Sequence, residues 1–362
     1  MKIFAICARM SASLMLLPFS LSVAAATPAA AARWTVPARV TVSHKDITFT
    51  GEGGALLHGT LYVPQKAQPV GAIVVTHGAS SPLRTSPLYQ HLVQIAPSLG
   101  MAVLIYDRRG SGASSAAKRS ENFDVLAADA IGAVEFLRHD RRIDPARVGV
   151  WGLSQGGWLA VLAAAHSPHV AFVVSISAPI VTPDVQMMFL STNSMMVFGY
   201  SASDIAQMQK LRKAVDDYAR GSVSRSYAQA LIDQAKDKPW YKYLYMGTKL
   251  HDREHSDWRE QIEMDPLKTL AMVRVPTLMI YGGEDPVVPV APSVARVKAL
   301  QASHLQLQLA VIPGADHGMQ LGVSPRDLLD PAKRDEEHPS APAYFATLAG
   351  WLEEIGVTQT GT

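Results

Sequence analysis

A serine flanked by glycines is the first feature of this chain that could do chemistry. Gly152, Ser154 and Gly156 form the pattern Gly-x-Ser-x-Gly, between the apolar run 148–151 and the apolar, Ala-rich run 158–165. These runs favour a strand and a helix, and a serine on the sharp turn between them is exposed as a nucleophile. Glycine tolerates the unusual backbone angles and close packing of such a turn. The simpler alternative is that Ser154 is only a turn residue in a glycine-rich loop.

Two later loops carry groups that would activate this serine. A serine needs a nearby base, and the base needs a third group that orients it. Asp285 follows the expected strand 277–281, and His317 follows the expected strand 307–312. His317 is therefore a candidate for the base, and Asp285 is a candidate for the orienting acid. The other acids that could take the second role are Glu284, Asp316 and Asp184.

Strands that alternate with helices must position these loops. After a hairpin over 39–63, the expected strands are 70–76, 101–106, 147–154 with its turn, 170–176, 277–281 and 307–312, and the expected helices are 88–99, 122–139, 158–165 and 343–355. Such alternation predicts an α/β fold with a mostly parallel sheet and helices on both faces. Sites in these sheets lie at the carboxyl ends of the strands. The residues just past expected strand ends are His77, Asp107, Ser154 and Asp285.

Residues 180–272 interrupt this alternation. The segment has helical character and no convincing strand, and it holds eight of the 14 methionines. We expect an inserted helical cap that divides the fold into a first core part, 34–179, and a second core part, 273–357. The methionine and aromatic side chains of the cap would either pack its own small core or line an adaptable apolar pocket.

The first 26 residues have the features of a secretory signal peptide. Lys2 and Arg9 precede the mostly apolar run 10–23, and residues 24–26 offer a small-residue cleavage site. The only cysteine, Cys7, falls in this segment, so the mature chain would hold no disulfide. We therefore expect a periplasmic or secreted bacterial protein.

The charge balance excludes some classes of partner. The chain has 33 basic and 31 acidic residues, and removal of residues 1–26 takes away two basic ones, which leaves 31 of each sign. A neutral protein has no electrostatic attraction for nucleic acid or, after signal cleavage, for an anionic membrane. The expected partner is a small-molecule ester or a short peptide, and the oligomeric state is not specified by the sequence.

Five motifs in a fixed order carry a resemblance to a known family. They are His77-Gly78, Asp107-x-Arg109-Gly110-x-Gly112-x-Ser114, the serine turn at 152–156, Gly282-Gly283-Glu284-Asp285-x-x-Val288-Pro289, and Asp316-His317-Gly318. With these motifs the chain resembles serine hydrolases of the α/β-hydrolase fold, and within them the dienelactone-hydrolase-like and prolyl-oligopeptidase-like esterases and peptidases. The order of nucleophile, acid and base is the order of that fold. The resemblance covers roughly residues 40–350 without the cap.

The resemblance implies a catalytic triad of Ser154, Asp285 and His317 that cleaves carboxylic esters through an acyl-enzyme. A peptidase or amidase that uses the same triad is the alternative, since fold does not decide between them. Two backbone N–H groups would bind the oxyanion, and these are expected from Gln155 and from Ala79, with Ser80 as an alternative. No cofactor and no metal are expected.

Other motifs point to weaker alternatives. His251 and His255 match the inverted zinc-peptidase pattern H-x-x-E-H, but the flanking residues are charged and no third ligand is evident. No dinucleotide loop is present, because Gly110-x-Gly112 lacks the third glycine. A binding protein that kept the fold would have lost a triad member, and none is lost. We expect His77, Asp107 and Arg109 to brace their loops.

Overall fold

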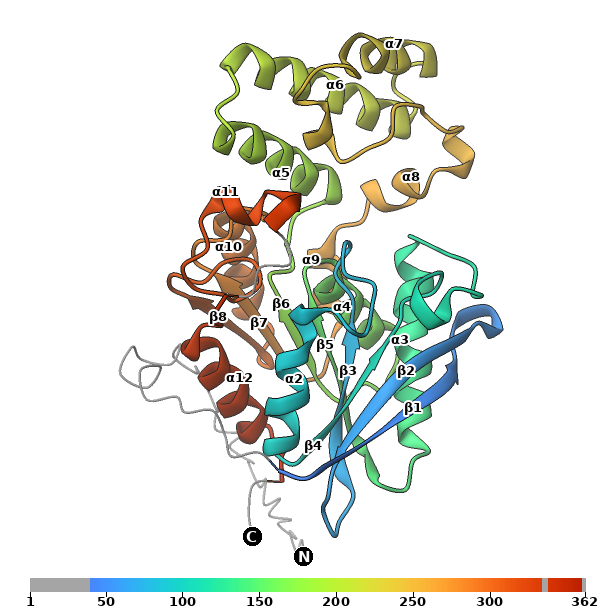
Figure 1. The fold of residues 1–362 in the computed structure, drawn as a ribbon, viewed down its shortest axis with the longest axis vertical. Coiled ribbons are helices and arrows are strands. Elements are labelled where there is room, and N and C mark those ends of the chain that lie inside the picture. The colour runs from blue at the N-terminus through green and yellow to red at the C-terminus, as the bar shows by residue number, and fades with distance from the viewer. Residues whose placement is uncertain (1–39, 334–337, 360–362) are drawn as a thin grey trace, which may run out of the picture.

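An eight-stranded sheet carries the fold (Figure 1). The computed structural model describes residues 40–333 and 338–359. The strands are β1 (Val42–Thr50), β2 (Leu56–Pro64), β3 (Val70–Thr76), β4 (Met101–Tyr106), β5 (Ile143–Leu153), β6 (Val173–Ile176), β7 (Thr277–Gly282) and β8 (Leu307–Ile312). Their order across the sheet is β1-β2-β4-β3-β5-β6-β7-β8. β2 is antiparallel to both β1 and β4, and the remaining neighbours are parallel.

Helices cover both faces of the sheet. The α-helices are α2 (Pro87–Ser98), α3 (Phe123–Arg138), α4 (Gln155–His166), α5 (Pro183–Val197), α6 (Ala202–Arg220), α7 (Arg225–Ala235), α8 (Asp257–Ile262), α9 (Pro266–Met272), α10 (Val290–Gln301), α11 (Pro325–Leu328) and α12 (Pro342–Glu354), and the 3-10 turns are η1 (Glu52–Gly54), η2 (Gly112–Ser114), η3 (Tyr241–Leu244), η4 (Arg253–His255) and η5 (Pro331–Lys333). One apolar cluster joins α3, α4, α9 and α10 to one face, and a second joins α2 and α12 to the other. This confirms the α/β-hydrolase fold that the sequence predicts.

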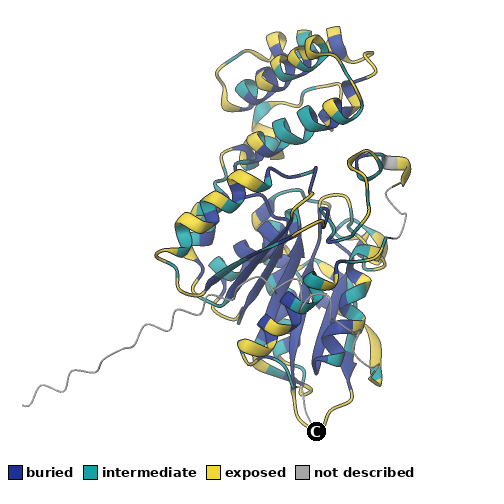
Figure 2. Ribbon diagram, turned by 90° about the vertical axis from the view of Figure 1, so that its left-hand side faces the viewer, coloured by how far each residue is buried: buried dark blue, intermediate teal, exposed yellow. Residues whose placement is uncertain are grey.

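Side chains of β3 show how the two clusters form. Ala72 and Val74 point to the α3–α4 side, and Ile73 and Val75 point to the α2–α12 side. All four are fully buried, and Figure 2 shows the strands of the sheet as mostly buried. Burial of a valine or isoleucine side chain stabilises a fold by roughly 1.5–3 kcal/mol, so a near-continuous apolar strand is suited to the middle of a two-sided sheet.

The helices α5 to α9 lie between β6 and β7, and the segment from 181 to 272 contains no strand. Figure 1 shows α5, α6, α7 and α8 together beyond the carboxyl ends of the parallel strands. This group, here called the cap, has its own apolar cluster, which includes Met195, Met208 and Trp240. Helix α9 differs from the rest, because Leu270 packs into the main core beside α4. The expected segment 180–272 therefore includes one helix of the core.

The expected signal segment 1–26 lies outside the described residues. None of the helices in residues 40–333 and 338–359 combines the length and hydrophobicity that a membrane-spanning helix requires.

Candidate active site

Ser154 lies on the sharp turn between β5 and α4. Its backbone has φ 58° and ψ −122°, a conformation that costs energy for any residue with a side chain. Its N–H donates to the carbonyl of Ile176 on β6 over 2.7 Å, which fixes the turn to the sheet. The partly exposed hydroxyl does not cap α4. The turn therefore presents the hydroxyl at the positive end of a helix.

Close packing explains the glycines around Ser154. A Cβ at Gly152 would overlap the carbonyl oxygen of Gly156, and a Cβ at Gly156 would overlap the carbonyl oxygen of Thr76. The hydroxyl of Thr76 lies 2.7 Å from the Gly156 carbonyl oxygen and 3.1 Å from that of Trp151. The turn is thus held by a buried contact from β3 as well as by its own backbone.

His317 and Asp285 meet across the loops that follow β8 and β7. Their Nδ1 and Oδ2 atoms are 2.7 Å apart. Asp285 Oδ1 accepts hydrogen bonds from the N–H groups of Val287 and Val288 at 2.7 and 3.1 Å. The Asp285 carboxylate is fully buried, whereas the His317 side chain is 15% exposed. With Nδ1 donating to the carboxylate, Nε2 of His317 is the nitrogen that can accept a proton.

No hydrogen bond joins Ser154 to His317 within residues 40–333 and 338–359. Hydrogen bonds between a nucleophile and its base are commonly long without substrate and tighten when substrate binds. The contact between His317 and Asp285 is therefore present in this structure without a hydrogen bond to Ser154.

The pKa of His317 is raised above its ordinary value. Burial of the ring lowers this pKa, but the charge of Asp285, the hydrogen bond to it and the charge of Asp316 together raise it by more. A higher pKa makes the imidazole a stronger base and stabilises the imidazolium that forms when a serine loses its proton.

The other candidate acids have different surroundings. Glu284 is exposed. Asp316 is buried, and its Oδ1 accepts from the N–H groups of Gly318 and Gln320 in its own loop at 2.8 Å. Asp184 lies on α5, where it pairs with Arg220 at 2.6 Å. Among these acids, Asp285 is the one that hydrogen-bonds to the ring of His317 in the described residues.

The expected oxyanion donors are the backbone N–H groups of Gln155 and Ala79, with Ser80 as the alternative. Gln155 is the first residue of α4, so its N–H has no partner inside the helix. Ala79 lies in the exposed loop after β3. In the part of the chain that the structure describes, neither N–H donates a hydrogen bond, and the same is true of Ser80. The two residues expected as alternatives for the second oxyanion donor, Ala79 and Ser80, are thus not distinguished by their hydrogen bonds.

Arg108 is a site residue that the sequence reasoning missed. Its buried guanidinium donates from Nη1 to Oε1 of Gln155 over 3.0 Å and from Nη2 to Glu121 over 2.7 Å. Burial lowers the pKa of Arg108. The side chain next to Ser154 is therefore held from the loop that follows β4. Nothing in the sequence distinguishes Arg108 from Arg109 beside it, so only the structure could find this contact.

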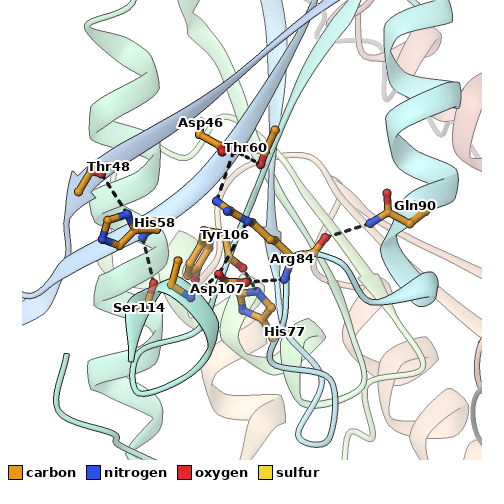
Figure 3. A network of polar contacts seen from close by, with 11 residues as sticks. Asp46, Thr48, His58, Thr60, His77, Arg84, Gln90, Tyr106, Asp107 and Ser114 are labelled. Carbon is orange, nitrogen blue, oxygen red and sulfur yellow. Dashed lines mark hydrogen bonds and ion pairs between the residues drawn. The ribbon is translucent and has the colours of Figure 1, made fainter. Parts of the chain in front are cut away.

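The loops after β3 and β4 are braced, as expected (Figure 3). Asp107 accepts hydrogen bonds from the N–H groups of Arg84 and Ala113, both at 2.9 Å. Arg109 pairs instead with Asp129 of α3, with nitrogen–oxygen distances of 2.5 and 2.6 Å. Asp107 and Arg109 thus brace the site through separate partners.

His77 is also structural. Its Nε2 donates to the carbonyl of Tyr106 over 2.5 Å (Figure 3). Burial lowers its pKa to about 4, so the ring is neutral near pH 7 and its donating nitrogen is occupied. It is 1% exposed, which makes it a link between β3 and β4.

The zinc-peptidase motif does not form the face that it needs. His251 precedes η4 and His255 ends it, and both are exposed. Two ligands at i and i+4 share a face only on an α-helix. Among the described residues, no group of three His, Cys, Asp or Glu side chains could hold a metal ion.

The eight methionines of the expected segment 180–272 lie in several different environments. Met195 and Met208 are fully buried in the cap cluster, and Met264 packs against the main core. Met196 is 61% exposed and Met272 is 55% exposed. Three of the eight methionines, Met195, Met208 and Met246, therefore pack the core of the cap, so the expectation of cap packing holds for part of the set only.

Residues 67–321 match the model of the family described as serine aminopeptidase, S33, which is more than half of the 362 residues. The chain belongs to this family of α/β hydrolases. It is thus an enzyme of the serine-hydrolase type. The curated relatives of this S33 hydrolase include proteins named as thiohydrolases, as a polyketide transferase and as non-heme haloperoxidases.

Three comparisons illustrate this range. The S33 hydrolase is 24% identical to thiohydrolase aneE of Aspergillus aculeatus over 258 residues, which cover 68% of this chain and 79% of the relative. It is 27% identical to a non-heme chloroperoxidase of Burkholderia pyrrocinia over 241 residues, 61% of this chain and 76% of the relative. A solved esterase of Pyrococcus furiosus superposes with a TM-score of 0.54 at 17% identity, over 89% of this chain and 98% of the esterase. This last likeness shows the fold alone.

Proposed function

We propose that this S33 hydrolase cleaves carboxylic esters through an acyl-enzyme on Ser154, with His317 as base and Asp285 as orienting acid. The observation that carries the proposal is the 2.7 Å contact between His317 Nδ1 and the buried Asp285 carboxylate, and the positive φ of Ser154 on its turn supports it. These are the geometric parts of a triad on this fold.

In the acylation step, the Ser154 oxygen forms a bond to the acyl carbon while its proton moves to Nε2 of His317. The tetrahedral oxyanion then collapses, the bond from the acyl carbon to the alcohol oxygen breaks, and His317 gives the proton to the leaving alcohol. Asp285 keeps Nδ1 as the donor and stabilises the charged ring in between. Water repeats the sequence on the acyl-enzyme, which releases the acid and restores Ser154.

The N–H groups of Gln155 and Ala79 would bind the oxyanion. Their hydrogen bonds are strongest when the carbonyl oxygen carries full charge, so they lower the barrier rather than only bind substrate. Loss of one such donor typically costs roughly 2.7–4 kcal/mol. Both N–H groups are without a partner among the described residues, which supports this role.

A peptidase that uses the same triad is the second candidate, and the description of the family favours it. An aminopeptidase needs an acid to hold the free amino terminus of its substrate. The cap offers Glu254, Glu260 and Glu263 for this role. Of these, Glu260 accepts a hydrogen bond from Asn122 and Glu263 pairs with Arg220. Only Glu254 is left, on the exposed turn η4. None of these contacts marks one of the three glutamates as the anchor for a substrate amino terminus.

Covalent labelling tests the proposal. A fluorophosphonate should add once to the mature parent and not to Ser154→Ala, as read by intact mass. A p-nitrophenyl ester series against aminoacyl anilides then decides between the two candidates. A parent that stays unlabelled while folded contradicts the proposed mechanism. Faster turnover of the anilides would put the peptidase first.

We further propose that the enzyme is exported, with cleavage of the signal segment 1–26. The charged start, apolar run and small-residue site support this. Expression of the full chain in a bacterium, followed by fractionation and N-terminal sequencing, checks it. Full-length protein retained in the cytoplasm would contradict export.

A further inference from the structure

The loop that holds Asp285 is hydrogen-bonded to the cap. Gln186 Nε2 donates to the carbonyl of Val287 over 2.8 Å. Asn193 Nδ2 donates to the carbonyl of Pro286 over 2.6 Å. Both side chains belong to α5, the first helix of the cap, and they are seven residues apart. They therefore lie on one face of the helix, about two turns apart.

These contacts share peptide groups with those of Asp285. The peptide group between Pro286 and Val287 accepts a hydrogen bond from Asn193 at its carbonyl, and its N–H donates to Asp285 Oδ1 over 2.7 Å. The next peptide group accepts from Gln186, and its N–H donates to the same Oδ1 over 3.1 Å. Hydrogen bonds in series polarise one another. Two parallel chains of hydrogen bonds thus run from α5 to the carboxylate.

Packing alone does not account for an amide at position 186. The Gln186 side chain is buried, with 7% of the residue exposed. Its Oε1 is buried without a hydrogen-bond partner in the described part of the chain, which disfavours the amide relative to a hydrocarbon of equal length. What the amide supplies, and a hydrocarbon would not, is the donor to Val287.

We propose that Gln186 and Asn193 are positioning residues that hold Asp285 against His317, so that the cap helix and the acid move as one unit. This rests on the triad of the proposed function. The charged groups that act on His317 within the described residues are Asp285 and Asp316. Asp316 is held by hydrogen bonds inside its own loop. The side-chain amides of Gln186 and Asn193 therefore act on the position of Asp285 and not on that of Asp316.

The variants remove the donors and keep the volume. Gln186→Met and Asn193→Leu are the two test variants. Gln229→Met is the matched control, because Gln229 on α7 also donates to a carbonyl, that of Thr248 at 2.9 Å, and accepts from the N–H of Leu250 at 2.9 Å. Its contacts stay inside the cap. Thermal unfolding of each protein establishes that it is folded.

Two readouts are measured on the intact mature protein. One is the pKa of His317 from an NMR titration of its ring, and the other is the fluorophosphonate labelling rate against pH. With Asp285 displaced, the pKa of His317 should fall in both test variants. The acidic limb of the labelling rate should move to lower pH with it, and the maximal rate should fall about 10-fold. Gln229→Met should match the parent.

An unchanged pKa of His317 in a folded test variant overturns the proposal, whether or not the rate falls, because a merely structural contact would lower the rate without moving the titration. An equal shift in Gln229→Met overturns it too. If the parent is not labelled but the test variants shift the titration, the proposed function fails and the positioning relation holds. If one variant does not fold, the other decides.

Discussion

Arg108 and Gln155 are 47 residues apart in the chain, and their Nη1 and Oε1 atoms are 3.0 Å apart in the fold. The residue after the nucleophile is therefore oriented from the loop after β4. Arg108 also contacts Glu121, whose carbonyl accepts a hydrogen bond from Gln261 of the cap helix α8. The nucleophile side of the site is thus tied to the cap, as is the acid side.

Arg108→Met should lower kcat by about 10-fold and leave KM nearly unchanged. The loss is indirect, so it should stay below the roughly 10²- to 10³-fold that removal of an oxyanion donor costs. The unfolding free energy should fall by no more than ~2 kcal/mol, because Glu121 is 36% exposed and stays hydrated. Steady-state kinetics and urea unfolding measure both.

Arg119→Met is the matched control for this prediction. Arg119 pairs with the same Glu121 at 3.0 Å, but its side chain is 77% exposed. It should change neither kcat nor stability measurably. An equal loss in the two variants would assign the effect to Glu121 rather than to Gln155.

The acidic limb of kcat/KM should lie above pH 6.5. His317 acts as base only when neutral, and its pKa is raised, so activity is lost as the pH falls through that raised value. Asp285→Asn should lower kcat by roughly 10³- to 10⁴-fold and move the limb to lower pH. Glu284→Gln, at the exposed neighbour, should change neither. A limb that stays in place in Asp285→Asn would contradict the assignment of the acid.

His77 should make the fold sensitive to acid without shaping the rate profile. Its pKa is lowered to about 4 by burial, whereas the unfolded chain has the ordinary value of about 6.5. The unfolded state therefore binds a proton first, and stability falls as the pH drops from 6.5 toward 4, by on the order of 3 kcal/mol. His77→Gln can still donate to Tyr106 but cannot titrate, so urea unfolding at pH 7 and pH 4.5 should show a smaller difference. An undiminished acid sensitivity would contradict this.

Ser154→Gly should be more stable than Ser154→Ala, although both are inactive. The backbone of Ser154 has φ 58°, which alanine finds as unfavourable as serine does and glycine adopts freely. After the higher entropy of glycine in the unfolded chain is subtracted, a difference of about 1 kcal/mol remains. Denaturant unfolding of the two variants side by side measures it. Equal stabilities would mean that the turn stores no strain.

The strands of the sheet were the most predictable part of the fold. The bounds 70–76, 101–106 and 307–312 agree with β3, β4 and β8 to the residue, because buried parallel strands are apolar runs that end at glycine, proline or polar residues. β6 begins at Val173 rather than at 170, since pairing and not hydrophobicity sets its start. α10 was not predicted, because Pro292 lies near its start and few apolar residues mark its buried face.

The site was predictable only where chemistry marks a residue. The types and order of Ser154, Asp285 and His317 point to a triad, and the structure brings the last two together. Arg108 and the two amides of α5 carry no such mark. Their roles depend on contacts between segments distant in the chain, which local patterns do not encode. Met195 and Met208 show the same limit, since composition could not assign them to packing.

The cap leaves the sheet after β6 and returns before β7, and these two strands are direct neighbours in parallel register. The chain therefore enters and leaves the cap between two adjacent strands. For this reason the cap can be shortened, lengthened or exchanged between relatives without changing the strand order of the sheet. A laboratory graft can exploit this, provided that the junction falls after Asn193. A donor cap joined before Asn193 would bring a new substrate surface, but Asp285 would lose the hydrogen bonds that connect it to α5.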